Sequence, residues 1–561
     1  MSAGLAAALQ VGAVLLILAL AYRPLGDYMA RVFTSEKDLR VERGLYRIAR
    51  IDARHGQTWG SYAVSALSFS LVGVLALYLI QRLQGVVPAN GGHSSVTPYV
   101  ALNTAVSFVT NTNWQSYSPE LTMGNLTQAA GLAVQNFVSA AVGLAIAIAL
   151  IRGIAAARGR DDLGNFWVDI TRAALRILLP LAFLVALILL TQGVVQSWHA
   201  GFDFVGIDGA RQHAVLAPAA SQEAIKEVGT NGGGIFNANS AHPFENPTPL
   251  SNIVEIIAML VIPVALVRTY GTMVKDQRQG YTILSVMAVI WGAMLTVIWV
   301  LESRTHGVAA DAAGSMMEGK EQRFGIPGSV LFATSTTGTS TGAVNSAHDS
   351  YSAGGGGALL WNMLLGEVAP GGVGAGMYSI LVFAIIAVFV GGLLVGRTPH
   401  LLGKKIGQQE ITMAALSILV MPILVLTGAA ISYAIPSAVS AMGNSGDHGS
   451  ASSMHGFTEV LYAFASAANN NGSAFGGITV TSPWYQIALS VAMWLGRFLP
   501  IVFILALAGL LAAQRSRPAT TATLPTHGAL FSSLLGGTIV LVAGLTFFPA
   551  IALGPIAEAL S

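Results

Sequence analysis

Long apolar segments recur along the whole chain, and they constrain its fold more than any other feature. A helix needs about 20 apolar residues to cross a bilayer, and ten segments approach that length, at 4–22, 63–81, 128–151, 174–192, 250–267, 281–301, 376–396, 411–434, 482–513 and 528–552. Only 10% of the residues are charged, whereas about a quarter are charged in soluble domains. The sequence therefore predicts an all-α polytopic membrane protein with about ten transmembrane helices.

Basic residues indicate how these segments are oriented. Of the 28 Lys and Arg residues, 21 lie in alternate connections, at 23–54, 152–176, 268–278, 397–405 and 515–517. Because cytoplasmic loops carry the excess of Lys and Arg, we expect both termini on the outer side of the membrane. The net charge is only +2 and there is no long basic run, which excludes a nucleic-acid-binding protein.

Four long connections on the predicted outer side share one pattern. Each holds a semi-apolar stretch that is too short to span the membrane, at 98–109, 217–228, 327–335 and 457–468. A polar block rich in Gly, Asn and Thr follows each stretch: VTNTNWQ from Val109, GTNGGG from Gly229, TSTTGTSTG from Thr334 and ANNNGS from Ala468. The sequence thus predicts four membrane–pore–membrane repeats in a pseudo-fourfold arrangement, with one extra helix at each end.

The chemistry of the backbone explains why such a repeat would be built. Non-helical backbone survives at membrane depth only where it is buried in protein or lines a watery cavity. Carbonyl oxygens of converging loops can replace the hydration shell of a cation, and the blocks contain no Asp or Glu. Neutral oxygens suit a monovalent ion better than Mg²⁺ or Ca²⁺. The alternative, four ordinary exposed turns, is weaker because the blocks recur at matching places.

Four strings in these connections resemble the KdpA family, the potassium-binding, channel-like subunits of bacterial Kdp potassium-transporting ATPases. They are TNTNWQ from Thr110, TNGGGIFNANSAHP from Thr230, STTGTSTGAVNSAHDS from Ser335 and SAANNNGSAF from Ser466. The resemblance covers essentially the full length. It implies selection of K⁺ from the outside, a location in the bacterial inner membrane, and a complex with a KdpB-like P-type ATPase subunit, a KdpC-like subunit and, in some members, a small KdpF-like peptide.

The resemblance also implies which residues bind and conduct the ion. The expected ligands are backbone oxygens near Asn111, Thr112, Thr230, Asn231, Thr336, Thr337, Asn470 and Asn471, in filter segments that include Thr110, Asn113, Gln115, Gly232, Gly338, Asn469 and Gly472. The string GEVAPGGVGAG at 366–376 has the composition of a flexible linker. It also resembles a gate below the filter, which makes Glu367, Gly371 and Gly372 candidates for the ion path.

Two further features of the sequence leave their interpretation open. Arg497 lies in an otherwise apolar span, where a structural ion pair with Glu255 and a role in the ion path, such as a barrier to cation leakage, are equally consistent with the pattern. His448 and His455 lie in a Ser/Gly-rich stretch and are interpreted as solvated side chains.

Nucleotide-binding motifs are missing from the sequence. It contains neither a GxxxxGK[ST] phosphate loop nor a DKTGT phosphorylation string, so we expect a non-catalytic subunit whose partner hydrolyses ATP. The rival hypotheses are a stand-alone Trk/Ktr-like potassium transporter and a membrane scaffold without an ion site. The expected segments are an N-terminal helix with a cytoplasmic segment (1–60), pore repeats at 61–155, 156–270, 271–405 and 406–515, and a C-terminal helix (516–561).

Overall fold

Ten helical segments dominate the computed structural model, which describes residues 2–87, 90–305, 308–446, 450–518 and 523–561. Within these residues, ten segments are long and apolar enough to cross a membrane, and they coincide with the ten that the sequence predicts. Six are single helices: α1 (Ala3–Thr34), α10 (Pro249–Met273), α11 (Gln277–Glu302), α15 (Ala375–Leu394), α16 (Gln408–Tyr433) and α19 (Pro483–Ala513). The other four join consecutive elements: α3 (Trp59–Leu83) with η1 (Gln84–Val86); η2 (Thr127–Leu132) with α6 (Ala133–Ala155); α7 (Phe166–Arg172) with η3 (Ala173–Leu178) and α8 (Leu179–Thr191); and α20 (Ala529–Ile551) with η6 (Ala552–Ile556) and α21 (Ala557–Leu560). The chain is a multi-pass membrane protein.

Four short helices lie between pairs of crossing helices, as predicted. They are α4 (Pro98–Val109), α9 (Ala219–Val228), α13 (Gly325–Gly338) and α18 (Ala451–Asn469). The third repeat has an additional helix, α14 (Ala353–Leu364), before α15. Helix α13 extends beyond the predicted stretch 327–335, and α18 begins earlier than 457. The architecture is therefore four membrane–pore–membrane repeats, with α1 and α20 as the extra helices.

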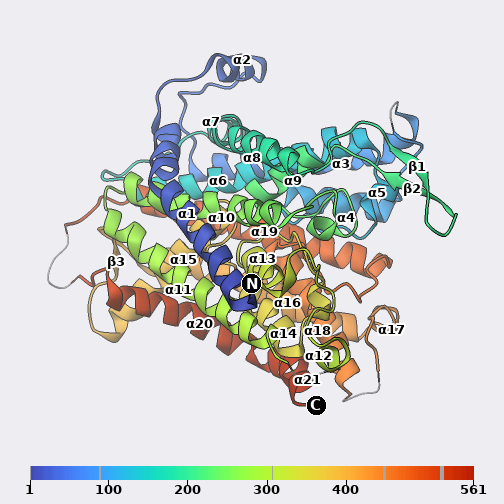
Figure 1. The fold of residues 1–561 in the computed structure, drawn as a ribbon. Helices are drawn as coiled ribbons and strands as arrows, with labels where there is room; N and C mark the ends of the chain where they lie inside the picture. The colour runs from blue at the N-terminus through green and yellow to red at the C-terminus, as the bar shows by residue number, and fades with distance from the viewer. Residues whose placement is uncertain (1, 88–89, 306–307, 447–449, 519–522) are drawn as a thin grey trace.

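Helix α6 lies at the centre of the bundle and α1 at its periphery. The most apolar window of α6 is 83% buried, whereas that of α1 is 11% buried, and α1 runs across the outside of the other helices in Figure 1. Helix α6 consists largely of Ala, Gly, Val and Ile, and its Gly143 and Gly153 contact the backbones of Val373 and Ala508. Small residues allow such close approach of membrane helices.

Short elements occupy the connections. Strands β1 (Gly201–Val205) and β2 (Arg211–Val215) form an antiparallel hairpin, in which Gly201 pairs with Val215, at one edge of the bundle (Figure 1). A second small hairpin pairs β3 (His400–Leu401) with β4 (Lys404–Lys405). The remaining elements are α2 (Arg40–Ile48), α5 (Pro119–Thr122), η4 (Asn239–Ala241), α12 (Val308–Ala313), η5 (His348–Ser350) and α17 (Pro436–Val439).

A buried ion pair joins the first two repeats to α1. Arg152 on α6 donates to both carboxylate oxygens of Asp169 on α7, at 2.5 and 2.8 Å. The hydroxyl of Tyr62 on α3 donates to the same carboxylate at 2.9 Å, and Arg152 also donates to the carbonyl of Phe33 at 3.1 Å. Because Asp169 is 1% exposed, its negative charge is compensated by these donors and not by water.

Removing the charge of Asp169 is expected to destabilise the protein. In Asp169→Asn the guanidinium of Arg152 stays buried without its counter-charge, a change that typically costs about 3–5 kcal/mol. The matched control is Asp162→Asn, because the side chains of Asp162 and Arg160 are 35% and 47% exposed and ion pairs at the surface contribute about 1 kcal/mol or less. Thermal unfolding of the detergent-solubilised protein measures both; equal shifts in the two variants contradict the proposed role.

His455 is wrongly predicted as solvated, because both of its ring nitrogens are bound by carboxylates. Nε2 lies 2.9 Å from Asp349 and Nδ1 lies 2.9 Å from Glu558, so the ring joins α18 to η5 and to the C-terminal α21 (Ala557–Leu560). Burial lowers the pKa of His455, but the two carboxylates outweigh this effect and raise it from 6.5 to about 10. His448 lies outside the described residues.

This contact predicts a specific dependence of stability on pH. A histidine whose pKa is raised on folding contributes stability that is complete below the unfolded value of 6.5 and is lost as the pH rises through about 10. Wild-type protein should therefore melt at a higher temperature than His455→Gln at pH 6.5, and the difference should shrink steadily by pH 10.5. Thermal melts of both proteins across this range measure it; a constant difference contradicts the expectation.

Candidate functional site

Four loops follow the ends of the four short helices, and their backbones repeat one pattern. One residue just after each helix has a positive φ, with values of 68°, 47°, 52° and 59° at Asn111, Thr230, Ser340 and Asn470. Two residues later φ is positive again, at Asn113, Gly232, Gly342 and Gly472. Left-handed residues end a helix by reversing the direction of the chain. The four loops therefore share one conformation, as expected of a repeated unit.

The residue between these two positions donates its N–H back to the helix that carries the loop. In order along the chain, Thr112 donates to Ser107 O, Asn231 to Lys226 O, Thr341 to Thr336 O and Asn471 to Ser466 O, at 2.9, 2.7, 3.2 and 2.8 Å. Among the described residues, no donor reaches the carbonyl oxygens of these same four loop residues. Buried carbonyls normally have a partner, so four free ones are available to bind a ligand.

The loops lie edge to edge in a ring. At three of the four contacts a glycine touches the carbonyl of the next loop, and a Cβ on it would lie 1.9 Å (Gly232 to Thr341 O), 2.0 Å (Gly342 to Asn471 O) or 1.9 Å (Gly472 to Thr112 O) from that oxygen. Any other residue would overlap the oxygen, so glycine is required there. At the fourth contact, Asn111 Nδ2 donates to Thr230 O at 2.8 Å, which closes the ring.

The third loop lies later in the chain than the residues that the resemblance implies, although within the polar block that the pattern predicts. Thr336, Thr337 and Gly338 belong to the last turn of α13, and the positions with the common loop conformation are Ser340 and Thr341. The run TSTTGTSTG holds two glycines and otherwise only small hydroxyl residues, so no side chain marks where the helix ends. Aligning Gly342 of the third block with Gly232 and Gly472 of the second and fourth would have identified Ser340, Thr341 and Gly342.

The other predicted filter residues lie in or beside the ring. Gln115 bridges the first two loops, because its Nε2 donates to Gly234 O at 3.1 Å and its Oε1 accepts the Gly234 N–H at 2.9 Å. The hydroxyl of Thr110 bonds to that of Thr112 at 2.8 Å. The carbonyl of Asn469 accepts a bond from the hydroxyl of Ser340 at 3.3 Å. Side chains thus tie the first loop to itself and to the second, and the third loop to the fourth.

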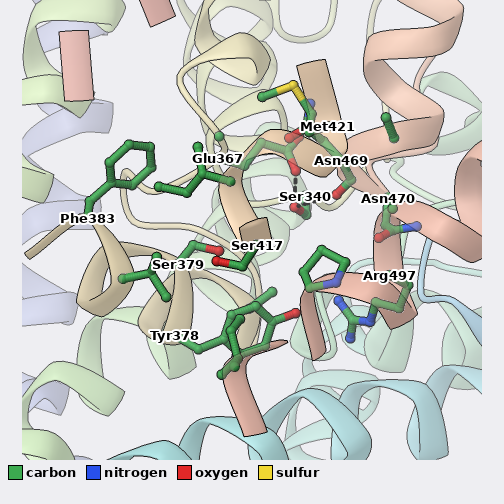
Figure 2. A pocket seen from close by; sticks show the side chains of 18 residues that line it. Ser340, Glu367, Tyr378, Ser379, Phe383, Ser417, Met421, Asn469, Asn470 and Arg497 are labelled. Carbon is green, nitrogen blue, oxygen red and sulfur yellow. Dashed lines mark hydrogen bonds between the residues drawn. The ribbon is translucent and has the colours of Figure 1, made fainter. Parts of the chain in front are cut away.

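Two cavities lie on opposite sides of the ring. One cavity, of about 420 Å³, is lined by residues that come after the four free carbonyls along the chain, among them Asn113, Gly233, Gly342 and Gly472. The other, of about 90 Å³, is lined by residues that precede them, Ser340, Asn469 and Asn470, together with Glu367 and Arg497, which Figure 2 shows around it. A cation in the ring would have a wide polar approach on one side and a small chamber on the other.

The segment 366–374, between α14 and α15, lies against the side of the ring that faces the small cavity. The N–H of Gly371 donates to Gly338 O at 2.8 Å, and the N–H of Val373 donates to the hydroxyl of Thr230 at 2.8 Å. Gly372 has the carbonyl of Thr339 as its nearest neighbour, 2.9 Å from where a Cβ would lie. These contacts fix a non-helical segment to the second and third loops.

Glu367 connects this segment to the third and fourth loops. Its side chain is 3% exposed, and one carboxylate oxygen accepts a hydrogen bond from the amide of Asn471 at 2.7 Å. The other oxygen accepts the hydroxyl of Ser340. Glu367 thus borders the small cavity (Figure 2) and holds the segment 366–374 to two loops of the ring.

The suggested ion pair between Arg497 and Glu255 is not formed. Among the described residues Arg497 has no carboxylate partner, and its Nη2 is buried without a hydrogen bond. Glu255 instead lies beside Glu223 and Glu227, with carboxylate oxygens within 4.8 Å of one another. Arg497 borders the small cavity that Glu367 also borders (Figure 2), and its role in the ion path stays a prediction.

Helix α9 carries buried charged side chains that are not predicted from the sequence, in which this stretch is interpreted only as semi-apolar. Lys226 is fully buried, and its Nζ lies 2.6 Å from Glu223 and 3.3 Å from Glu245. Glu245 also accepts the N–H of Ile235 at 2.6 Å, just after the second loop. The ion pairs therefore connect α9 to the segment that follows the second loop. In the sequence, the i, i+3 spacing of Glu223 and Lys226 on one helix face could have indicated this ion pair.

Comparison with known proteins agrees with this arrangement. Residues 12–560 match the KdpA family, described as the potassium-transporting ATPase A subunit. The chain belongs to this family. It is 67% identical to the potassium-transporting ATPase potassium-binding subunit of Nocardia farcinica over 100% of both chains. It is 56% identical to that of Kineococcus radiotolerans, over 99% of this chain and 98% of the relative.

The fold also resembles that of a solved potassium transporter. The structure of TrkH from Vibrio parahaemolyticus matches with a TM-score of 0.51 over 80% of this chain and 84% of TrkH, at 13% sequence identity. At this identity the likeness shows a common fold alone.

Gly232 is the position where the ring predicts the clearest effect of a single substitution. The Cβ of Gly232→Ser would overlap Thr341 O and displace the third loop, so we expect apparent potassium affinity to fall by about tenfold or more, equivalent to roughly 1.4 kcal/mol. The matched control is Gly44→Ser on α2, outside the ring, since no atom lies within 4 Å of a Cβ at Gly44. Potassium uptake kinetics in a transport-deficient bacterium measure both; equal affinities in the two variants contradict the prediction.

Proposed function

We propose that this chain is the potassium-binding, channel-like subunit of an ATP-driven potassium uptake complex. The observation that supports this most is the ring of four loops with free backbone carbonyls. Four neutral oxygens around one axis can replace the water shell of K⁺. The loops contain no Asp or Glu, which disfavours Mg²⁺ and Ca²⁺. The family to which the chain belongs is named for the same ion.

The proposed filter ligands are the backbone carbonyls at the middle of each loop. They belong to Thr112, Asn231, Thr341 and Asn471 and to the residues directly before them, Asn111, Thr230, Ser340 and Asn470. In this proposal Thr336 and Thr337 orient the third loop without binding the ion. Thr336 does so through its hydroxyl, which donates to Ala343 O at 2.7 Å. Gly338 serves as the contact for the segment 366–374.

We propose further that the ion does not pass straight through the chain. The segment 366–374 lies under the ring, and the cavity next to it measures only about 90 Å³. Glu367 would receive the ion there, and Arg497 would repel it from a direct exit by its like charge. The ion would then leave sideways into a KdpB-like P-type ATPase subunit, assembled with a KdpC-like subunit and a small KdpF-like peptide.

The orientation and segment limits are part of the same proposal. Basic residues concentrate at one end of the bundle, so both termini and the wide cavity would face the outside of a bacterial cell membrane. The repeats would occupy 61–155, 156–270, 271–405 and 406–515, between an N-terminal segment (1–60) and a C-terminal one (516–561). ATP hydrolysis would reside in the partner.

The second candidate is a stand-alone transporter, which the common fold with TrkH brings into consideration. Potassium uptake by the chain purified alone and by the chain co-purified with an ATPase subunit distinguishes the two. Potassium uptake at full affinity by this chain without an ATPase subunit favours the stand-alone transporter, whereas uptake that requires the partner and ATP supports the proposal. An anomalous-scattering map of the complex with Tl⁺ tests the ion site directly, with density expected on the ring axis.

Gln115→Arg tests whether the mouth of the ring is close to the ion. The guanidinium would add a positive charge and would break both bonds of Gln115 to Gly234, so we expect apparent potassium affinity to fall by tenfold or more, or roughly 1.4 kcal/mol. The matched control is Gln212→Arg, which adds the same charge on the exposed hairpin strand β2. Uptake kinetics at several ionic strengths measure both; unchanged kinetics in Gln115→Arg place the ion elsewhere.

A further inference from the structure

A third cavity opens on the periphery of the bundle and has no part in the proposed ion path. It measures about 400 Å³ and lies between α1, α10 and α11. Its walls are largely apolar and include Leu15, Leu18, Leu260 and Trp291. Helix α1 is the least buried of the crossing helices, so this groove opens toward the acyl chains of the bilayer.

One end of the groove carries a positive charge that no acidic side chain compensates. Arg23 lines the groove and donates to the hydroxyl of Tyr281 at 3.4 Å. Among the described residues Arg23 has no carboxylate within ion-pair distance, because its neighbour on α1, Asp27, pairs with Arg268 at 2.8 Å. The hydroxyl of Tyr22, also in the wall, is buried without a hydrogen-bond partner. This end of the groove therefore offers donors to an anion.

The dimensions of the groove fit part of a phospholipid. Along α1 the wall runs from Arg23 to Leu15, which at 1.5 Å per residue is about 12 Å, or roughly eight to ten methylenes of an acyl chain. An ammonium or zwitterionic head group gains less from a lone arginine than a phosphate with a net negative charge does. Charge and shape together select an amphipathic anion over a neutral lipid.

We infer that this groove binds one anionic phospholipid, whose phosphate contacts Arg23 and Tyr281 and whose acyl chain lies along Leu15, Leu18 and Trp291. With the orientation proposed above, Arg23 lies at the cytoplasmic end of the apolar part of α1, where anionic lipids attract basic residues; only the choice of leaflet rests on that proposal. Pro370 also lines the groove, so the bound chain reaches the segment 366–374 that lies under the ring.

Native mass spectrometry of the complex, purified in mild detergent and supplemented with phosphatidylglycerol, tests the charge at the groove. In Arg23→Gln the retained phosphatidylglycerol should fall about tenfold, as expected for the loss of one charge-assisted contact. The matched control is Arg278→Gln, which removes the same charge from an exposed position at the start of α11 and outside the groove; it should retain lipid like the wild type. Phosphatidylcholine should be retained weakly by all three proteins.

A second variant tests the groove without changing its charge. Ala288 is an exposed residue of the wall, so Ala288→Trp should fill the space of the acyl chain and reduce lipid retention as Arg23→Gln does. Val289→Trp adds the same ring on the neighbouring residue, which is 70% exposed and lies outside the groove, and should have no effect. Equal retention by wild type, Arg23→Gln and Ala288→Trp overturns the inference, as does a small peptide bound in place of lipid. Tl⁺ density in the ring, measured on the same variants, reports on the potassium site independently.

Discussion

The N–H groups of the four loops turn back toward the helices that carry them, and the rest of the site depends on this arrangement. Backbone at membrane depth has no water to bond to, so a non-helical loop is stable only if the protein itself provides partners for the polar groups of the loop. Here one N–H in each loop caps the preceding helix. In the first repeat the N–H of Thr112 donates to the carbonyl of Ser107, and in the fourth the N–H of Asn471 donates to the carbonyl of Ser466. The carbonyls of the same loop residues accept no hydrogen bond among the described residues, which is why we propose them as ligands of the ion.

The ring constrains its surroundings because its members touch one another through backbone atoms. A carbonyl that lies against Gly232 or Gly472 cannot move without moving the next loop, so the loops act as one unit. The segment 366–374 extends this unit, since Glu367 bonds to side chains of the third and fourth loops and Val373 bonds to the second. A change beneath the ring is thereby transmitted to three of the four loops.

Much of the fold and part of the site could be predicted from the sequence. The ten crossing helices and the short helices α4 and α9 followed from segment length and hydropathy, because lipid imposes both on any spanning helix. The position of the third loop did not follow, since Ser340 and Thr337 are chemically too similar to mark a boundary. The two carboxylates around His455 come from Asp349 and Glu558, and nothing in the local sequence points to either.

By itself, the amino-acid sequence determined the membrane class, the repeated unit and the absence of acidic residues from the four loop blocks. These properties depend on composition and on spacing along the chain, which hydropathy and turn chemistry already fix. The tertiary structure decided which carbonyls remain free, which glycine lies against which loop, and that Arg497 borders a cavity with Glu367 instead of pairing with Glu255. Such contacts join residues that are far apart in sequence, and only the packing of helices from different repeats brings them together.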